Sequence, residues 1–151
     1  MYYLKTPSQM LFGHTSESGL IPEAEVPPAY TRPKFESWTS VTYEKTFLDH
    51  LVQLCFTWVH PFCILFPKVL FLRDMIRGQS KYCSALLVNA VLVCARCFSN
   101  DPKSRTNPSD SSTAGDHFFA EAKSLFSQQE HSNLVTVQAL ALMGLREASS
   151  N

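Results

Sequence analysis

The first candidate for a catalytic or metal-binding site is a Cys-x-x-Cys pair, Cys94 and Cys97. This spacing serves redox catalysis and zinc binding, which need accessible thiolates and, for zinc, two further ligands at a matching spacing. The pair lies inside a strongly apolar run, and the sequence contains no second Cys-x-x-Cys and no His-x-x-x-His. We therefore interpret both cysteines as small buried residues and predict no metal ligands in this chain.

His60 is the next candidate, because it stands directly before Pro61 in an aromatic-rich stretch. A catalytic histidine needs a nucleophile or a carboxylate within hydrogen-bond reach. The acids nearest to it in sequence are Asp49 and Asp74, and neither is an immediate neighbour. We favour a structural histidine that forms a hydrogen bond at a helix end, and keep an enzyme with a cleft near His60 and Asp74 as an alternative.

His117 and Glu121 are four residues apart on an expected helix, but one such pair cannot complete a metal site, so we expect a solvated face. Arg73 and Asp74 are expected to pair with neighbouring elements or to cap a helix. The sequence shows no glycine-rich phosphate loop, Gly-x-Ser-x-Gly elbow, His-Glu-x-x-His or Walker pattern. We predict that the chain is not an enzyme and has no catalytic or cofactor-binding residues.

Composition narrows the class of protein further. The chain has 151 residues, of which 45% are hydrophobic and 12% aromatic, so it can build a core for one domain or for part of one. The formal net charge is zero, which gives no overall attraction to DNA, RNA or an acidic membrane. All five cysteines lie within the apolar stretch from Leu51 to Phe98, which is typical of reduced thiols in the cytosol or nucleus.

The elements that must position these residues are helices. Residues 1–40 contain five of the nine prolines and are predicted to be a largely disordered linker. Residues 41–151 form the predicted domain, of the all-α class. Apolar residues recur at spacings of three and four there, which predicts about five helices, near residues 42–60, 68–77, 84–99, 114–129 and 134–148.

Caps and buried faces follow from the same pattern. Ser84 and Asn133 are predicted N-caps, and Gly78 a C-terminal cap. The helix near residues 84–99 is apolar nearly all round and should be central. The first helix is predicted to bury Phe47, Leu51, Leu54, Cys55 and Trp58. The second is predicted to bury Val69, Leu72 and Ile76, and the last to bury Val137, Leu140, Ala141 and Leu145.

Two alternatives concern the apolar stretches. Leu51 to Leu72 is long enough to span a bilayer, so a small integral membrane protein with spans near residues 51–72 and 86–98 is an alternative. Pro61, Pro67 and Lys68 argue against it, because they divide the run and place a charge within it. The apolar helices also outnumber the elements that could cover them, so we expect an incomplete domain.

Short blocks along this region resemble the middle homology, or regulatory, domain of fungal zinc-cluster transcription factors. The xylanolytic-activator and nitrate-regulator types are the most similar. The blocks follow the family order from about Phe47 to Ser149. The residues that carry the resemblance, expected to be structural, are Trp58, His60, Pro61, Phe71, Leu72, Arg73, Asp74, Tyr82, Cys83, Ser84, Asn89, Phe118, Phe119 and Gln138. Ala85, where the family often has proline, and Cys97 are mild departures.

The resemblance implies an all-helical regulatory domain that acts in transcription regulation through contacts within the factor or with protein partners. It implies a nuclear protein, no membrane partner, and a possible homodimer of the full-length factor. Members of the family bind DNA through a separate N-terminal cluster in which six cysteines hold two zinc ions. This chain lacks that cysteine array, so we expect neither zinc nor DNA binding by the chain itself. The family domain continues with further helices, and the chain therefore resembles its N-terminal part.

Overall fold

The computed structural model describes residues 38–149. The predicted linker therefore lies outside the described residues, except for residues 38–40. Within the described part the protein is all-α, as predicted, and it contains no strand beyond an isolated bridge between Arg105 and Ala114. The five α-helices are α1 (Lys45–Leu54), α2 (Lys68–Arg77), α3 (Ala85–Ala95), α4 (Asp116–Ser127) and α5 (Leu134–Ser149).

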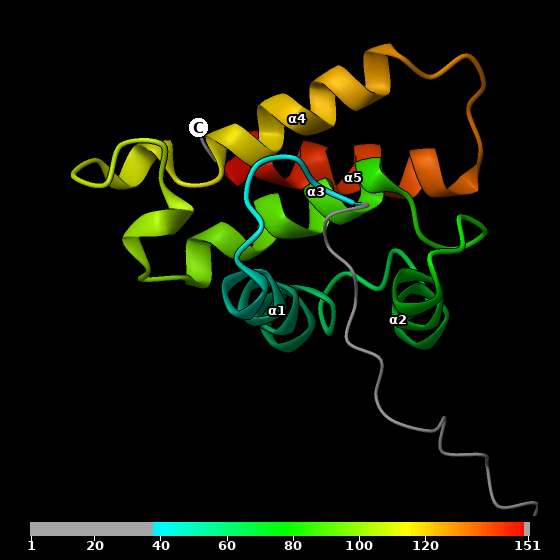
Figure 1. Ribbon diagram of the computed structural model, residues 1–151, viewed down its shortest axis with the longest axis horizontal. Coiled ribbons are helices and arrows are strands. Elements are labelled where there is room, and N and C mark those ends of the chain that lie inside the picture. Colours follow the sequence, from blue (N-terminus) through cyan, green and yellow to red (C-terminus); the bar gives the residue numbers. More distant parts are fainter. Residues whose placement is uncertain (1–37, 150–151) are drawn as a thin grey trace, which may run out of the picture. The chain divides into compact units, whose positions relative to one another are not determined.

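Helix α3 is the centre of the fold. Every residue from Leu86 to Ala95 is buried, and α3 contacts α1, α4 and α5. Figure 1 shows α1 and α2 on one side of α3 and α4 and α5 on the other. The sequence predicted this central position, because a helix that is apolar on all sides needs partners on all sides.

The predicted caps are present. The Ser84 hydroxyl oxygen accepts the Leu87 N–H at 3.1 Å, and the Asn133 side-chain oxygen accepts the Thr136 N–H at 2.9 Å. Gly78 ends α2 with a φ of 68°, the left-handed conformation that glycine adopts without a Cβ penalty. These local contacts satisfy backbone groups that a helix end leaves unpaired.

The buried face of the first helix differs from the prediction. Helix α1 begins at Lys45 and continues directly into a π-helical turn, Cys55–Val59, before the chain reaches Pro61. The wider turn shifts the face on which later side chains lie. Trp58, predicted to be buried, is therefore 52% exposed, and Phe56 is buried in its place.

The prediction for α2 was also wrong about the inner face. Phe71, Asp74 and Met75 are buried, whereas Val69 is 77% exposed. The ring centroids of Phe71 and Phe66 lie 5.0 Å apart, in a cluster that also includes Phe56. Helical spacing allowed two overlapping apolar faces, and the face with the larger ring is the buried one.

Helix α5 presents the opposite face from the predicted one. The predicted inner residues Val137, Leu140, Ala141 and Leu145 all point outward. The buried residues are Val135, Thr136, Ala139, Leu142 and Met143. Ala139 is small enough for α5 to approach α3, and the Thr136 hydroxyl donates to the Gln129 side chain at 2.7 Å, so this face satisfies its one polar group.

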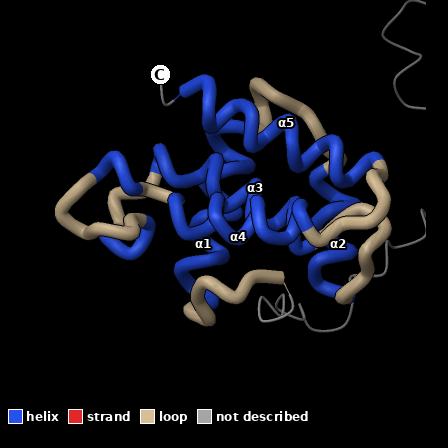
Figure 2. Tube along the Cα trace, turned by 90° about the horizontal axis from the view of Figure 1, so that it is seen from above, coloured by secondary structure: helices blue, strands red, loops and turns tan. Residues whose placement is uncertain are grey.

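Helix α4 buries Phe118, Phe119 and Ala122. A loop, residues 99–115, joins α3 to α4 and extends at one end of these helices (Figures 1 and 2). Among residues 38–149, no helix is long and apolar enough to cross a membrane. The proposed first span, residues 51–72, is instead divided between α1, the π-helical turn, a loop and α2.

Candidate protein-contact surface

A polar contact around Asp74 joins α2 to the start of α3. The Asp74 side chain is fully buried, and its Oδ1 accepts hydrogen bonds from Arg73 Nε at 2.9 Å and Nη2 at 2.7 Å. Its Oδ2 accepts the Tyr82 N–H at 2.9 Å, next to the buried Cys83. Burial alone raises the pKa of Asp74, but these hydrogen bonds and the nearby charges of Arg73 and Lys81 outweigh it and lower the pKa below its ordinary value.

A second buried polar contact, around Asn89, holds the segment before α1. Asn89 Nδ2 donates to the Trp38 carbonyl oxygen at 3.0 Å and to the Ala85 carbonyl oxygen at 2.9 Å. Its Oδ1 accepts the Thr39 hydroxyl at 3.0 Å. The Trp38 indole N–H donates to the Met75 carbonyl oxygen at 3.1 Å, so this segment contacts both α3 and α2.

His60 lies in a hydrogen-bonded loop. One ring nitrogen is 2.9 Å from the Phe66 carbonyl oxygen, and the ring packs edge-on against Phe56 and Phe66. Pro61 is exposed, and Leu72 is half-buried against the hydrophobic core. The ring nitrogen that faces Phe66 is thus committed to a backbone contact.

The remaining resemblance residues lie on α4 and α5. Phe118 is fully buried, and Gln138 is half-buried on α5. The Phe119 ring is approached by the Arg146 guanidinium at 4.1 Å and by Lys123 Nζ at 4.3 Å, which are cation–π distances. Arg146 also pairs with Asp116, so the end of α5 is attached to the start of α4.

The prediction that both cysteines of the Cys-x-x-Cys pair are buried was wrong for one of them. Cys94 is buried and its thiol lies 3.3 Å from the Leu142 carbonyl oxygen, but Cys97, predicted to be buried, is exposed. The helix changes from α to 3-10 geometry at Arg96, and the second cysteine falls beyond the covered part of α3. Burial raises the pKa of the Cys55 and Cys94 thiols to about 12, which makes them poor nucleophiles.

The described residues do not fit the zinc cluster that the family resemblance implies. Such a cluster needs six cysteines, whereas the chain has five, and three of these are buried in the core. Nowhere in residues 38–149 do three His, Cys, Asp or Glu side chains come together as a metal site.

The outward side of α5 carries a stripe of apolar side chains. We call it the α5 outer face and define it as Leu134, Val137, Leu140, Ala141 and Leu145. Leu134 is 68% exposed and Val137 58% exposed. These positions follow helical spacing, so they form one stripe of the kind that usually packs against another element.

This stripe runs into a pocket beside the end of α5. The pocket has a volume of about 230 Å³, and its lining is mostly apolar, with Val59, Val93, Phe98 and Leu145 among its residues. The Trp58 ring stacks on Phe98, with the centroids 6.0 Å apart and the planes within 13°. Leu145 belongs to both features, so we treat the α5 outer face, this C-terminal pocket and Trp58 as one candidate protein-contact surface.

The sequence pattern alone did not identify this surface. It placed Trp58 and the stripe of α5 in the core, because an apolar residue at helical spacing is usually buried. One feature of the sequence does point to the surface: α5 is apolar on two sides, and only one of these sides can pack against α3, so the other needs a second partner.

Comparison with known proteins places the chain in a family. Residues 52–151 match the family model described as the fungal specific transcription factor domain. The nitrogen assimilation transcription factor nirA of Emericella nidulans is 49% identical over 115 residues, and nit-4 of Neurospora crassa is 44% identical over 122 residues. The notoamide biosynthesis transcriptional activator notL' of Aspergillus versicolor is 36% identical over 111 residues.

These matches cover 72–74% of this chain but only 11–17% of each relative, so the chain spans less than a fifth of their length. No solved structure matches the chain significantly. The relatives are transcription factors, a class of protein that is not enzymatic, and the resemblance found in the sequence is confirmed. The chain belongs to the fungal specific transcription factor domain family.

Proposed function

We propose that this chain acts in the nucleus as part of the regulatory region of a transcription factor, through protein contacts rather than through catalysis. DNA binding and zinc binding would belong to a cluster outside the chain. Membership of the fungal specific transcription factor domain family supports a role in transcription regulation. The names of three relatives, all regulators of transcription, support the same role.

The candidate protein-contact surface is the single observation that carries the proposal. An apolar stripe on one helix, continuous with an apolar pocket, has the geometry of a groove or face that receives another helix. The buried polar contacts around Asp74 and Asn89 are satisfied internally, so they hold the scaffold that presents α5.

The partner that we propose is an amphipathic helix from elsewhere in the full-length factor. The relatives are much longer than the matched region, which leaves room for such a segment on the same polypeptide. An intramolecular partner has a high effective concentration, so a modest apolar stripe is sufficient for binding. A second copy of the chain or a separate coregulator would use the same surface and is distinguished by experiment.

Charge substitution on the α5 outer face tests the proposal. The gene is replaced in its fungal host by one that encodes Val137→Asp and Leu140→Asp, and transcripts are compared with those of wild-type and deletion strains. We expect the double variant to reproduce most of the deletion profile while the purified protein keeps its helical circular dichroism, because both side chains are outside the core. A fluorescent protein fused to the factor should be nuclear in the wild-type strain and in the double-variant strain.

Ala120→Asp is the control, because it adds a charge at an exposed position of α4 that is not part of the α5 outer face. It should give the wild-type transcript profile. A double variant that also regulates transcription like the wild type would show that the α5 outer face is not used.

A further inference from the structure

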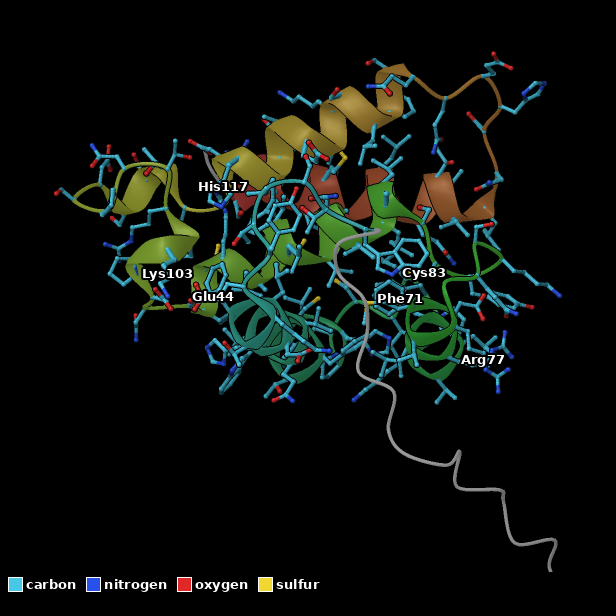
Figure 3. The ribbon with its side chains drawn as sticks, in the orientation of Figure 1. Glu44, Phe71, Arg77, Cys83, Lys103 and His117 are labelled. Atoms are coloured by element: carbon cyan, nitrogen blue, oxygen red, sulfur yellow. The ribbon has the colours of Figure 1, made fainter. Side chains whose placement is uncertain are left out.

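A second pocket, of about 400 Å³, lies between the start of α1 and the loop that joins α3 to α4. Its lining includes three basic side chains, Lys103, Arg105 and His117, together with Thr106 and Glu44. Figure 3 shows Glu44, Lys103 and His117 at this end of the molecule. The pocket is remote in sequence from the α5 outer face, and the proposed contact function does not use it.

Thr106 presents an accessible hydroxyl on an ordered loop. The residue is exposed, and its Oγ1 lies 3.3 Å from His117 Nδ1. The loop is closed behind it, because the Thr106 N–H donates to the Thr113 carbonyl oxygen at 3.2 Å and the Asn107 N–H donates to Thr113 Oγ1 at 2.9 Å. The hydroxyl is therefore held at the edge of the basic pocket.

The charges around Thr106 suit a phosphate and also mark a substrate sequence. Lys103 and Arg105 stand three residues and one residue before it, so two basic side chains flank the hydroxyl on its N-terminal side, where basic-directed Ser/Thr kinases bind positive charge. The same two residues and His117 line the pocket that the hydroxyl faces. A phosphate dianion is stabilised by charge-assisted hydrogen bonds from such groups.

We propose that Thr106 is a phosphorylation site for a basic-directed Ser/Thr protein kinase, with the phosphate received by His117 and Lys103. In the transfer, Thr106 Oγ1 attacks the γ-phosphorus of ATP and forms the new O–P bond. The bond from the γ-phosphorus to the bridging oxygen breaks, ADP leaves with that electron pair, and the hydroxyl proton passes to a base of the kinase.

The phosphate changes an existing ion pair. Lys103 Nζ now contacts both Glu44 carboxylate oxygens, at 2.7 and 2.8 Å, and Glu44 directly precedes α1. A dianion on Thr106 competes for Lys103 and repels Glu44. Phosphorylation therefore loosens the contact between this loop and the start of α1, and gives the pocket a regulatory effect.

His117 provides a local measure of the phosphate. Loss of solvent lowers the pKa of His117, with the Asp116 carboxylate acting in the opposite direction. The groups that share the pocket with it are Glu44, Lys103 and Arg105. A phosphate beside Nδ1 favours the protonated ring and raises that pKa.

The test uses the purified chain, ATP and the catalytic subunit of cAMP-dependent protein kinase, with sites mapped by tandem mass spectrometry. We expect phosphate on the peptide that carries Thr106, at least a tenfold loss of phosphate from that peptide in Thr106→Ala, and a reduced rate of its phosphorylation in Lys103→Ala. Ser109→Ala, in the same loop, should leave incorporation unchanged. Proton NMR titration should show a higher His117 pKa in the phosphorylated chain.

Two outcomes overturn the proposal. If Thr106 is not phosphorylated, or if the same peptide of Thr106→Ala carries as much phosphate as in the wild type, the site is elsewhere. If Thr106 is phosphorylated but the His117 titration does not move, the pocket does not receive the phosphate.

Discussion

Asp74 joins α2 to the chain segment that leads into α3. It is buried, and three donors surround its carboxylate: two nitrogens of Arg73 and the Tyr82 N–H. Removing this acceptor leaves the partly buried Tyr82 N–H unpaired, and hydrogen bonds to charged groups contribute about 1.5–3 kcal/mol each. Asp74 therefore fixes the short connection between α2 and α3 as well as its own helix.

Asp74→Asn should lower the free energy of unfolding by about 2 kcal/mol at pH 7, because the amide keeps one acceptor but places N–H groups toward Arg73. Folding lowers the pKa of Asp74, so its contribution is present above the ordinary pKa and is lost as pH falls through the folded value. Urea unfolding at pH 7 and pH 3 should show the difference from wild type shrinking at pH 3.

Glu130→Gln, at an exposed position, is the control and should change stability little at either pH. An equal loss for Asp74→Asn at both pH values would show that its charge is not what stabilises the fold.

Thiol reactivity should distinguish the exposed Cys97 from the three buried cysteines. Cys97 is exposed, whereas Cys55, Cys83 and Cys94 are buried and burial raises the pKa of all three thiols. Iodoacetamide should label Cys97 at least tenfold faster than these three in the native protein, with the difference lost in urea. Mass spectrometry of each peptide over time measures this. Native labelling of Cys94 as fast as Cys97 would contradict the packing of α3 against α5.

At the scale of the helix, replacing each of two glycines by alanine should change the stability of the protein in opposite directions. Gly78 has a φ of 68°, and no atom would contact an added Cβ, so backbone strain alone determines the effect there. Gly144 lies inside α5 with equally open space. Gly78→Ala should destabilise the protein by about 1 kcal/mol, and Gly144→Ala should stabilise it by roughly 0.5–1 kcal/mol. Thermal unfolding followed by circular dichroism compares the two; a shared sign would refute the assigned conformation of one of them.

The elements that the sequence predicts well are those with one clear solution. Helix α3 has no polar side to misplace, and the caps at Ser84, Gly78 and Asn133 depend only on local chemistry. The caps could be recognised from residue type alone, because each one satisfies a backbone group within the same few residues.

The faces of α1, α2 and α5 could not be fixed in this way. The π-helical turn at Cys55–Val59 changes the helical period just where Trp58 was placed in the core. Helices α2 and α5 each carry two apolar faces, and the choice between them depends on which one fits α3 and the aromatic cluster. The candidate contact surface was missed for the same reason, since it consists of the faces assigned to the core.

At the scale of the whole molecule, α3 joins the two groups of helices. Leu87 is fully buried there, so Leu87→Ala should create a cavity and cost about 2–5 kcal/mol in the free energy of unfolding. Leu134→Ala removes the same atoms from a largely exposed position of α5 and should cost less than about 0.5 kcal/mol. Urea unfolding of both variants measures the contrast. Similar costs would mean that α5 packs through its outer face.

The central claim is that the protein acts through the α5 outer face, and site-specific photo-crosslinking tests it most directly. A benzoyl-phenylalanine is placed at Val137 or, as a control, at Gln53, an exposed position of α1, and the protein is irradiated in fungal cells. We predict strong crosslinks from position 137 to a helical segment of the same factor, identified by mass spectrometry, and few from position 53. Crosslinking from position 137 no stronger than from position 53 would contradict the claim.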